Sequence, residues 1–181
     1  MHLFFAFVIF ILLLWNFLKY KNNQNPVNKI KLPSYLPIFF IFCLLLQICI
    51  GAFVSGLNAA EIYQSWPLMG QSYFPDDSSI NDFFSISAFE DPSLIQFIHR
   101  NMAYFIVVLF IYIAVIVFKN SNFIYLRKTI FYIFLFLLLQ IFLGILTIIS
   151  GAQIFLASMH QIGSIFLIIS SLVLVFKNST N

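Results

Sequence analysis

LLLQICIG, residues 44–51, returns almost unchanged as LLLQIFLG, residues 137–144. Each copy is apolar except for one glutamine, and each ends in a glycine one helical turn later. These residues are Gln47 and Gly51 in the first copy, and Gln140 and Gly144 in the second. Small residues let membrane helices approach closely, and buried amides bond to neighbouring helices. The repeat predicts a duplicated pair of helices. The simpler alternative is two helices that share one packing solution.

The whole chain is as apolar as this repeat. Of its 181 residues, 62% are hydrophobic, 8% are charged and 25 are Phe. Charged residues make up about a quarter of a soluble domain. A soluble fold of this length cannot bury so much apolar surface, so we expect an all-α, polytopic membrane protein. Cys43 and Cys49 lie inside one apolar run and are interpreted as packing residues without a disulfide.

Five apolar segments are candidates for membrane-spanning helices, each of which needs about 20 residues. They are Leu3–Leu18, Tyr35–Ser55, Leu94–Phe118, Ile130–Ile149 and Phe155–Phe176. A signal peptide has basic residues before its apolar stretch, whereas here they follow it in KYKNNQNPVNKIK (19–31). We therefore expect the first segment to remain as a transmembrane helix. The expected organisation is one helix (1–20), a linker (21–34) and a four-helix bundle (35–181) with a loop (57–93).

Charge predicts the orientation in the membrane. All six acidic residues lie between Glu61 and Asp91, and that stretch contains no Lys or Arg. Eight of the nine basic residues lie in the connections after segments one, three and five. The positive-inside rule then places the linker and the carboxyl terminus in the cytoplasm, and the amino terminus and the acidic loop outside the cell (inner) membrane. Arg100, the ninth basic residue, breaks this pattern, which indicates a separate role.

All three histidines occupy equivalent positions. His2, His99 and His160 each lie near the outer end of a helix expected to run from outside to inside. His99 is about six residues, or roughly 9 Å, into its helix, and His160 lies at a similar depth. Each is followed four residues later, on the same helix face, by a small residue. These small residues are Ala6, Ala103 and Ser164. Such a patch leaves room for a flat ligand.

A histidine inside a membrane either bonds to a neighbouring helix or headgroup, or serves a function. Three at one depth favour ligation. Zinc would need further Cys or carboxylate ligands nearby, whereas two imidazoles from facing helices suit a bis-histidine haem. Arg100 is placed to hold a haem propionate through a charge-assisted hydrogen bond, and snorkelling to the interface is a compatible alternative. The aromatic residues of the loop, such as Trp66, form either a lid over the haem or an interfacial belt.

Three stretches resemble, in order and spacing, the carboxyl-terminal half of the haem A synthase family. They are GAFVSGLNAAEIYQSWPLMGQSYFPDD (51–77), QFIHRNMAY (96–104) and SMHQIGS (158–164). The opening MHLFFAFVIFILLLW (1–15) resembles the family's fourth transmembrane helix, starting at its histidine. The resemblance implies one of two similar four-helix bundles. It also implies an oxidoreductase that converts a methyl group of haem O to the formyl group of haem A, for cytochrome oxidase.

The resemblance also implies roles for individual residues. His99 and His160 would be the axial ligands of a haem b cofactor, Arg100 would contact a propionate, and His2 would be one of two histidines that face the substrate, haem O. The sequence departs from the family in lacking the first three helices, and with them a Glu-x-x-His-Arg motif; Gln96 stands where that glutamate would precede His99. We therefore expect an incomplete substrate pocket. The expected partners are membrane lipid, haem O and an amino-terminal half chain or haem O synthase, with no nucleic acid.

Three functions remain open at this point. The chain is the cofactor half of a haem A synthase that acts with a complementary half, or a small membrane b-type cytochrome that transfers electrons or carries haem without catalysis. The third alternative is a membrane assembly subunit whose histidines bind nothing.

Overall fold

The structure is a computed structural model that describes residues 2–21 and 30–180, with side chains from residue 5 to residue 179 of these ranges. Its long helices are α1 (His2–Lys21), α2 (Tyr35–Gly56), α4 (Pro92–Lys119), α5 (Ile124–Ile149) and α6 (Ile154–Thr180). Its short helices are η1 (Ala59–Glu61), α3 (Ile80–Phe83), η2 (Ile86–Phe89) and η3 (Ser121–Phe123). The part of the chain described contains no strand, only an isolated bridge between Met69 and Ser72. The prediction of an all-α fold is confirmed.

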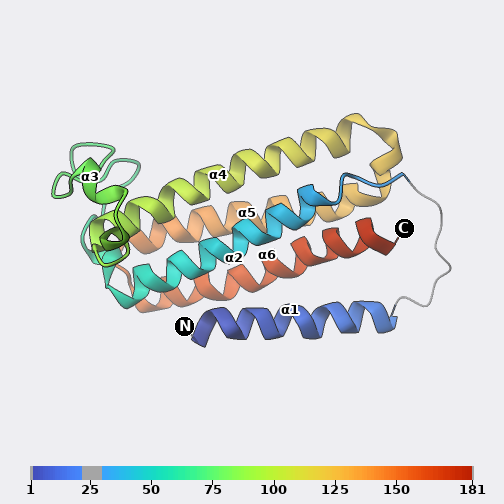
Figure 1. Cartoon of the computed structure of the whole chain (residues 1–181), viewed down its shortest axis with the longest axis horizontal. Helices are drawn as coiled ribbons and strands as arrows, with labels where there is room; N and C mark the ends of the chain where they lie inside the picture. The colour runs from blue at the N-terminus through green and yellow to red at the C-terminus, as the bar shows by residue number, and fades with distance from the viewer. Residues whose placement is uncertain (1, 22–29, 181) are drawn as a thin grey trace.

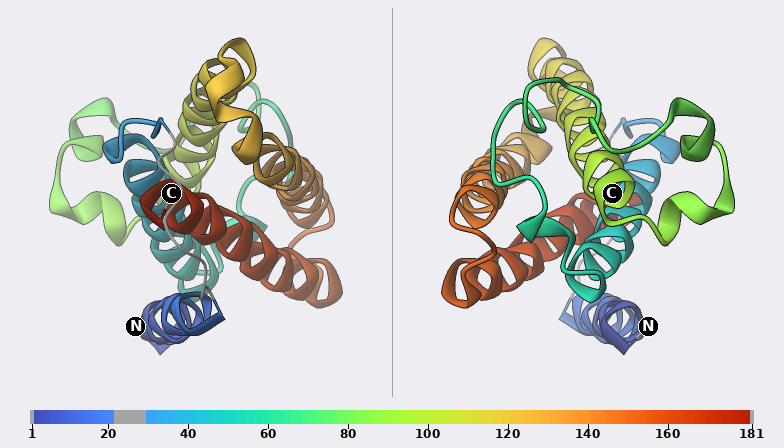
Figure 2. Two further views of the ribbon diagram at one scale, coloured as in Figure 1. Left: turned by 90° about the vertical axis from the view of Figure 1, so that its right-hand side faces the viewer. Right: turned by 90° about the vertical axis from the view of Figure 1, so that its left-hand side faces the viewer.

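Four of the helices, α2, α4, α5 and α6, form an elongated bundle, and α1 lies alongside it next to α6 (Figure 1). Views along the bundle show the four helices around a common axis and α1 outside them (Figure 2). The segment between α2 and α4, with η1, α3 and η2, lies at one end, which we call the loop end. The opposite end, where α1, α4 and α6 finish with Lys21, Lys119 and Lys177 in their last turns, is called the basic end.

The number of membrane-spanning helices differs from the prediction of five. Among the described residues, the four bundle helices are long and apolar enough to cross a membrane. Helix α1 is not one of them. The side chains of its first residues, up to Phe4, lie outside the described ones, so the part of α1 that is described with side chains is shorter than the roughly 20 residues a crossing needs. The prediction of an integral membrane protein therefore rests on the bundle.

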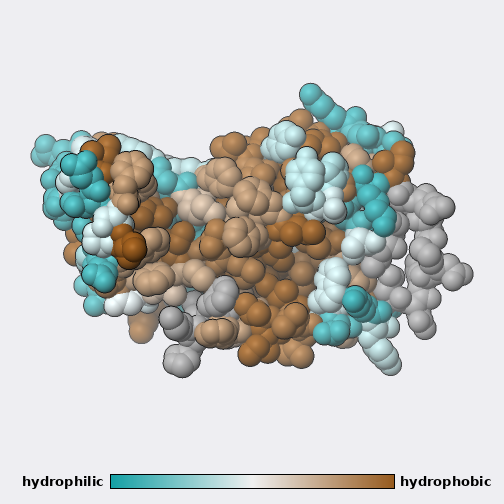
Figure 3. Space-filling model, viewed as in Figure 1, coloured by the Kyte–Doolittle hydropathy of each residue, from teal (hydrophilic) through white to brown (hydrophobic). Residues whose placement is uncertain are grey.

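On the face that Figure 3 shows, apolar residues cover the middle of the molecule and hydrophilic residues gather at its two ends. Large side chains on the outer faces of the helices are exposed. They include Ile9, Val108, Phe131 and Phe142. Soluble proteins rarely expose a contiguous apolar surface of this extent, whereas lipid tails cover it at no cost. The surface fits a protein whose bundle helices cross a bilayer.

Helices α2 and α5 are buried mainly in the half of the bundle nearer the basic end. Phe40, Ile113 and Ile133 are at most 1% exposed there, and five residues of α2 between Leu36 and Leu44 are buried. Toward the loop end the packing loosens. None of residues 45–52 in α2 or 141–148 in α5, all of them described, is buried. The two copies of the repeat therefore lie where the buried residues of α2 and α5 give way to partly exposed ones.

Candidate functional site

His99 and His160 lie at matching depths on helices of the same direction. Both α4 and α6 begin at the loop end (Figure 1). His99 lies seven residues after Pro92, the first residue of α4, and His160 lies six after Ile154, the first of α6. At 1.5 Å per residue, both are about 10 Å into their helices. The two histidines therefore lie at similar distances from the starts of their helices, as expected from the sequence.

The start of α4 is held by Asp91, the residue before its first turn. The Asp91 carboxylate accepts hydrogen bonds from the backbone N–H groups of Ser93 (2.8 Å) and Leu94 (3.2 Å). Pro92 follows the cap and needs no hydrogen-bond partner for its nitrogen. This capping determines where the helix begins, and therefore how deep His99 lies.

Each histidine packs against the glycine of one repeat. A Cβ atom added at Gly51 of α2 would lie 3.2 Å from Cε1 of His99 and 3.8 Å from its Nδ1. A Cβ atom added at Gly144 of α5 would lie 3.2 Å from Cε1 of His160 and 3.6 Å from its Nδ1. We call these two contacts the glycine cradles. The repeat thus places an imidazole against a glycine twice, once in the α2–α4 pair and once in the α5–α6 pair.

The two repeat glutamines differ in their contacts. Gln47 Nε2 donates a hydrogen bond to the backbone carbonyl of His99 (3.0 Å) and lies 3.2 Å from Nε2 of the same imidazole. The amide of Gln140 instead packs against Gly163 of α6, and its Nε2 has no hydrogen-bond partner. The side chain of Gln47 therefore contacts His99 itself, whereas the side chain of Gln140 contacts α6 three residues beyond His160.

Both imidazoles carry a buried nitrogen without a hydrogen-bond partner. Nδ1 of His99 and Nδ1 of His160 are both in this condition. Buried polar atoms normally have a partner, and each exception calls for an explanation. The two rings lie at the same depth of the bundle, on α4 and α6. In the neighbouring helices, neither residues 45–52 of α2 nor residues 141–148 of α5 include a buried residue.

The donor set fits a haem better than a zinc ion. Within residues 2–21 and 30–180, no group of three or more His, Cys, Asp or Glu side chains comes together to hold a metal ion. A zinc site takes three or four such ligands. Two imidazoles without further donors are the ligand set of a bis-histidine haem. The residues at this position therefore fit a haem, which His99 and His160 could hold.

Arg100 is buried beneath the loop instead of reaching the surface. Its side chain is 6% exposed. Its two terminal nitrogens donate hydrogen bonds to the backbone carbonyls of Tyr63 (3.1 Å) and Leu68 (3.3 Å), and Gln96 Nε2 donates to the same Tyr63 carbonyl (3.0 Å). The snorkelling alternative does not describe this side chain. The Nε of Arg100 is buried and has no hydrogen-bond partner, so at least this donor of the guanidinium is left for a further acceptor.

The loop is fastened to the start of α4 by a polar network around Asp77. Its carboxylate accepts hydrogen bonds from Tyr63 Oη (2.8 Å) and Ser93 Oγ (2.7 Å). Burial acts to raise the pKa of Asp77, but the hydrogen bonds to its carboxylate, led by those from Ser93 and Tyr63, together hold the pKa below its ordinary value. The loop therefore carries a fixed negative charge next to the helix start, where it is favourable.

Aromatic side chains complete the contact between the loop and α4. The ring of Phe97, two residues before His99, contacts Tyr73 (5.6 Å), Phe74 (5.1 Å) and Phe83 (6.0 Å) between centroids. Tyr73 Oη also donates a hydrogen bond to Asn101 Oδ1 (2.6 Å). The loop thus lies over the helix turn that carries His99, while Trp66 remains 45% exposed.

The other residues named from the sequence do not join this site. His2 is the first residue of α1, and its side chain lies outside the described residues. Cys43 and Cys49 are both free thiols, and Cys43 is buried in the core. The sequence reasoning recognised Gly51 and Gly144 as part of a repeat but did not connect them to the histidines. Their equal spacing from the repeat glutamines was the available signal.

Replacing Arg100 with glutamine should loosen the loop. Two hydrogen bonds from a buried guanidinium disappear, and each bond to a charged group contributes about 1.5–3 kcal/mol. We expect the loop to open at least about tenfold more often, measured as faster proteolytic cleavage within residues 57–91. Arg127→Gln is the matched control, since Arg127 bonds to the Phe118 carbonyl at the basic end. Equal cleavage rates in the two variants would contradict a fastening role for Arg100.

Comparison with known proteins gives a consistent family. Residues 1–172 match a family described as "Cytochrome oxidase assembly protein". "Heme A synthase" of Pelagibacter ubique is 40% identical over 178 residues, which are 98% of this chain and 52% of that protein. "Heme A synthase" of a Wolbachia endosymbiont of Brugia malayi is 36% identical (95% and 50%), and that of Rickettsia felis is 34% identical (89% and 50%). The chain spans about half the length of these relatives. No solved structure matches.

Proposed function

Because this chain belongs to the cytochrome oxidase assembly protein family, we propose that it is the haem-b-binding half of a haem A synthase. The complete activity would be oxidation of a methyl group of haem O to the formyl group of haem A. The observation that carries the proposal is the pair of imidazoles, His99 and His160, each set against a repeat glycine with a buried Nδ1 that has no partner.

The residues of this chain would hold and orient the cofactor. His99 and His160 would be its axial ligands, and the glycine cradles would leave each ring the space to face the bundle interior. When bound between them, haem b supplies one-electron transfer. Gln47, which donates to the His99 carbonyl, would keep that helix turn in register. Metal affinity commonly falls about 10–100-fold when such supporting contacts are lost.

Arg100 would link the cofactor to the loop. Its terminal nitrogens are bonded to loop carbonyls, and its Nε–H is buried and available. A propionate accepted by that group would receive a charge-assisted hydrogen bond. The aromatic contacts of the loop around Phe97 would keep water from the haem edge. This supports the lid interpretation of the loop more than the belt interpretation.

The substrate side would lie toward α1. A groove of about 490 Å³ runs between α1 and α6, lined by Ala6, Phe7, Phe10, Ser158, Gln161, Ile162 and Ile165. It borders the helix turn of His160, and Ala6 lies one turn after His2. We propose that this groove is one wall of the haem O pocket, with His2 as a substrate ligand, and that a second four-helix bundle supplies the other wall. With the positive-inside rule, both haems would lie near the outer face of the inner membrane.

A second candidate is a membrane b-type cytochrome without catalysis. It is favoured because this chain would supply both ligands of the proposed cofactor side but only one of the proposed substrate side. The proposed cofactor ligands, His99 and His160, both belong to this chain, whereas the resemblance requires a substrate-side partner for His2 from another segment.

Co-expression separates the two candidates. We expect haem A to form when the chain is produced together with the remaining segment of the Pelagibacter ubique relative, in a host that makes haem O but lacks its own haem A synthase. Haem extracted from the membranes and separated by chromatography gives the answer. If the chain binds a b-type haem but no haem A appears with the complementary segment, the synthase proposal fails and the cytochrome remains.

A further inference from the structure

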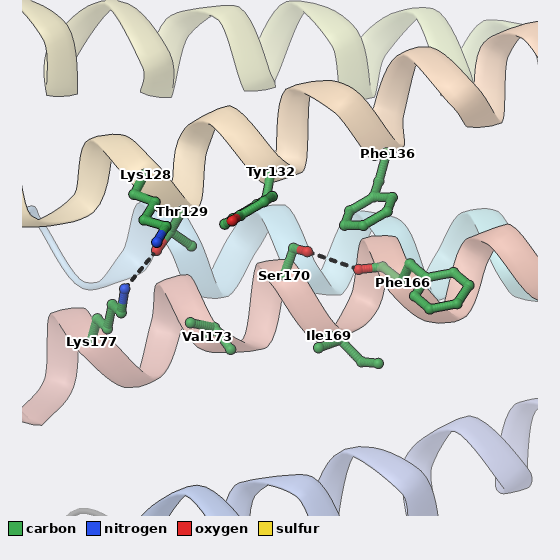
Figure 4. A pocket seen from close by; sticks show the side chains of 9 residues that line it. All are labelled: Lys128, Thr129, Tyr132, Phe136, Phe166, Ile169, Ser170, Val173 and Lys177. Atoms are coloured by element: carbon green, nitrogen blue, oxygen red, sulfur yellow. Dashed lines mark hydrogen bonds between the residues drawn. The ribbon is translucent and has the colours of Figure 1, made fainter.

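A second groove opens between α5 and α6 near the basic end of the bundle. It measures about 450 Å³. Figure 4 shows the side chains around it, which come from these two helices alone. They are Lys128, Thr129, Tyr132 and Phe136 of α5, and Phe166, Ile169, Ser170, Val173 and Lys177 of α6. The groove lies away from His99 and His160, at the other end of the helices, so the haem site does not use it.

One end of the groove is cationic. Lys128 and Lys177 extend toward the same point from opposite helices (Figure 4), and Lys177 Nζ donates a hydrogen bond to Thr129 Oγ1 (3.1 Å). The six Asp and Glu side chains of the sequence all belong to the loop at the opposite end of the molecule. The residues that line this end of the groove therefore include two basic side chains and no acidic one.

The other end of the groove is apolar. Phe136 and Phe166 stack with centroids 5.6 Å apart and form its far wall. Ile169 and Val173 form the side contributed by α6. The Ser170 hydroxyl donates to the Phe166 carbonyl within its own helix (2.9 Å), so it demands no polar ligand. From Thr129 to Phe136 the groove follows seven residues of helix, or about 10 Å.

We propose that this α5–α6 groove binds an anionic phospholipid, with its phosphate between Lys128 and Lys177 and an acyl chain along Phe136 and Phe166. Such a lipid has a negative headgroup for the cationic end of the groove and an apolar tail for its other end. The groove opens on the outer face of two membrane-spanning helices, where lipid is the solvent, and its cationic end lies among the basic residues that border the bilayer. Basic pockets between transmembrane helices recognise anionic lipid headgroups in this way.

The test uses the full chain, purified in a mild detergent and loaded from a mixture of phosphatidylglycerol and phosphatidylcholine. Native mass spectrometry counts the lipids retained. We expect the wild-type chain to retain phosphatidylglycerol preferentially, and the double variant Lys128→Gln/Lys177→Gln to bind it about thirtyfold more weakly, since each lysine near a membrane surface contributes a factor of about five. The double variant Lys21→Gln/Lys119→Gln removes the same charge from the basic end outside the groove, and it should bind normally.

A second variant tests the apolar half. Val173→Trp fills the groove and leaves both lysines in place, so it should also lose the lipid. Equal binding of the two phospholipids, an equal loss in the control variant, or full binding by Val173→Trp would each overturn the proposal. A photoreactive residue at Val173 that crosslinks in membranes to another polypeptide instead of to lipid would overturn it as well.

Discussion

Replacing His99 or His160 with alanine should remove the b-type haem from the chain. Each substitution deletes one axial ligand, and a haem held by two imidazoles cannot stay low-spin with one. Loss of a supporting contact alone lowers metal affinity about 10–100-fold, so loss of a ligand should exceed that range. The measurement is the reduced-minus-oxidised spectrum of the purified chain, normalised to protein, which should lose its low-spin signal in either variant.

Matched controls distinguish the loss of an axial ligand from misfolding and from ligation by another residue. Met102 lies three residues after His99, and Met159 lies directly before His160, so either sulfur is a conceivable axial ligand. Met102→Leu and Met159→Leu should keep the spectrum. His99→Gly should regain haem when imidazole is added, because the cavity left by the ring accepts the free base. A low-spin signal that survives His99→Ala or His160→Ala would remove that residue from the site.

Filling a glycine cradle should have an effect nearly as large. Even a methyl group at Gly51 or Gly144 would lie 3.2 Å from the facing imidazole, closer than van der Waals contact allows without a shift. A leucine side chain must displace the ring by more. Overpacking of this kind costs about 1–3 kcal/mol, and here the displaced group is the proposed ligand. We expect Gly51→Leu and Gly144→Leu to lose most of their haem while the chain still inserts in membranes.

Gly56 offers the matched control for the cradle variants. It lies in the same helix as Gly51, one turn nearer the loop, and a Cβ atom there would meet nothing within 4 Å. Gly56→Leu should therefore retain haem at the wild-type level. Haem loss in Gly56→Leu equal to that in Gly51→Leu would mean that added bulk in α2, and not contact with His99, is responsible.

The long helices could be predicted because a membrane-spanning helix requires a long apolar run in the sequence. Apolar runs of about 20 residues must be helical to satisfy their backbone groups. The predicted segment Tyr35–Ser55 agrees closely with the observed α2. The prediction for the fourth segment, Ile130–Ile149, began too late, because α5 starts at Ile124 and includes Arg127 and Lys128. Hydropathy marks the hydrocarbon core, but a helix continues into the polar region beyond it.

The depth of the histidines could also be predicted, since distance along a helix converts directly to height. Their contacts could not. Which glycine faces which imidazole depends on how four helices rotate about their axes, and that rotation is set by packing across the whole bundle. The sequence pointed to small residues on the histidines' own helices, Ala103 and Ser164. The structure also places Gly51 and Gly144 of the neighbouring helices against the rings.

The hydrogen-bond partners of Arg100 could not be predicted from the sequence, for a different reason. Its partners, the carbonyls of Tyr63 and Leu68, belong to a loop without regular structure. Backbone carbonyls exist at every residue, so no sequence pattern indicates which of them turn toward a guanidinium. The same holds for Asp77, whose bonds to Tyr63 and Ser93 join residues that are 14 and 16 positions away. The charge of Arg100 in an apolar helix indicated a function, but only the fold shows which groups it bonds to.

The central claim is that His99 and His160 share one haem iron within a single chain. Near-infrared magnetic circular dichroism of the oxidised, purified wild-type chain tests it most directly, since the charge-transfer band of a low-spin ferric haem identifies both axial ligands. The account predicts a bis-imidazole band with one haem per chain. A histidine–methionine band, a high-spin ferric haem, or two half-occupied haems with one imidazole each would contradict it.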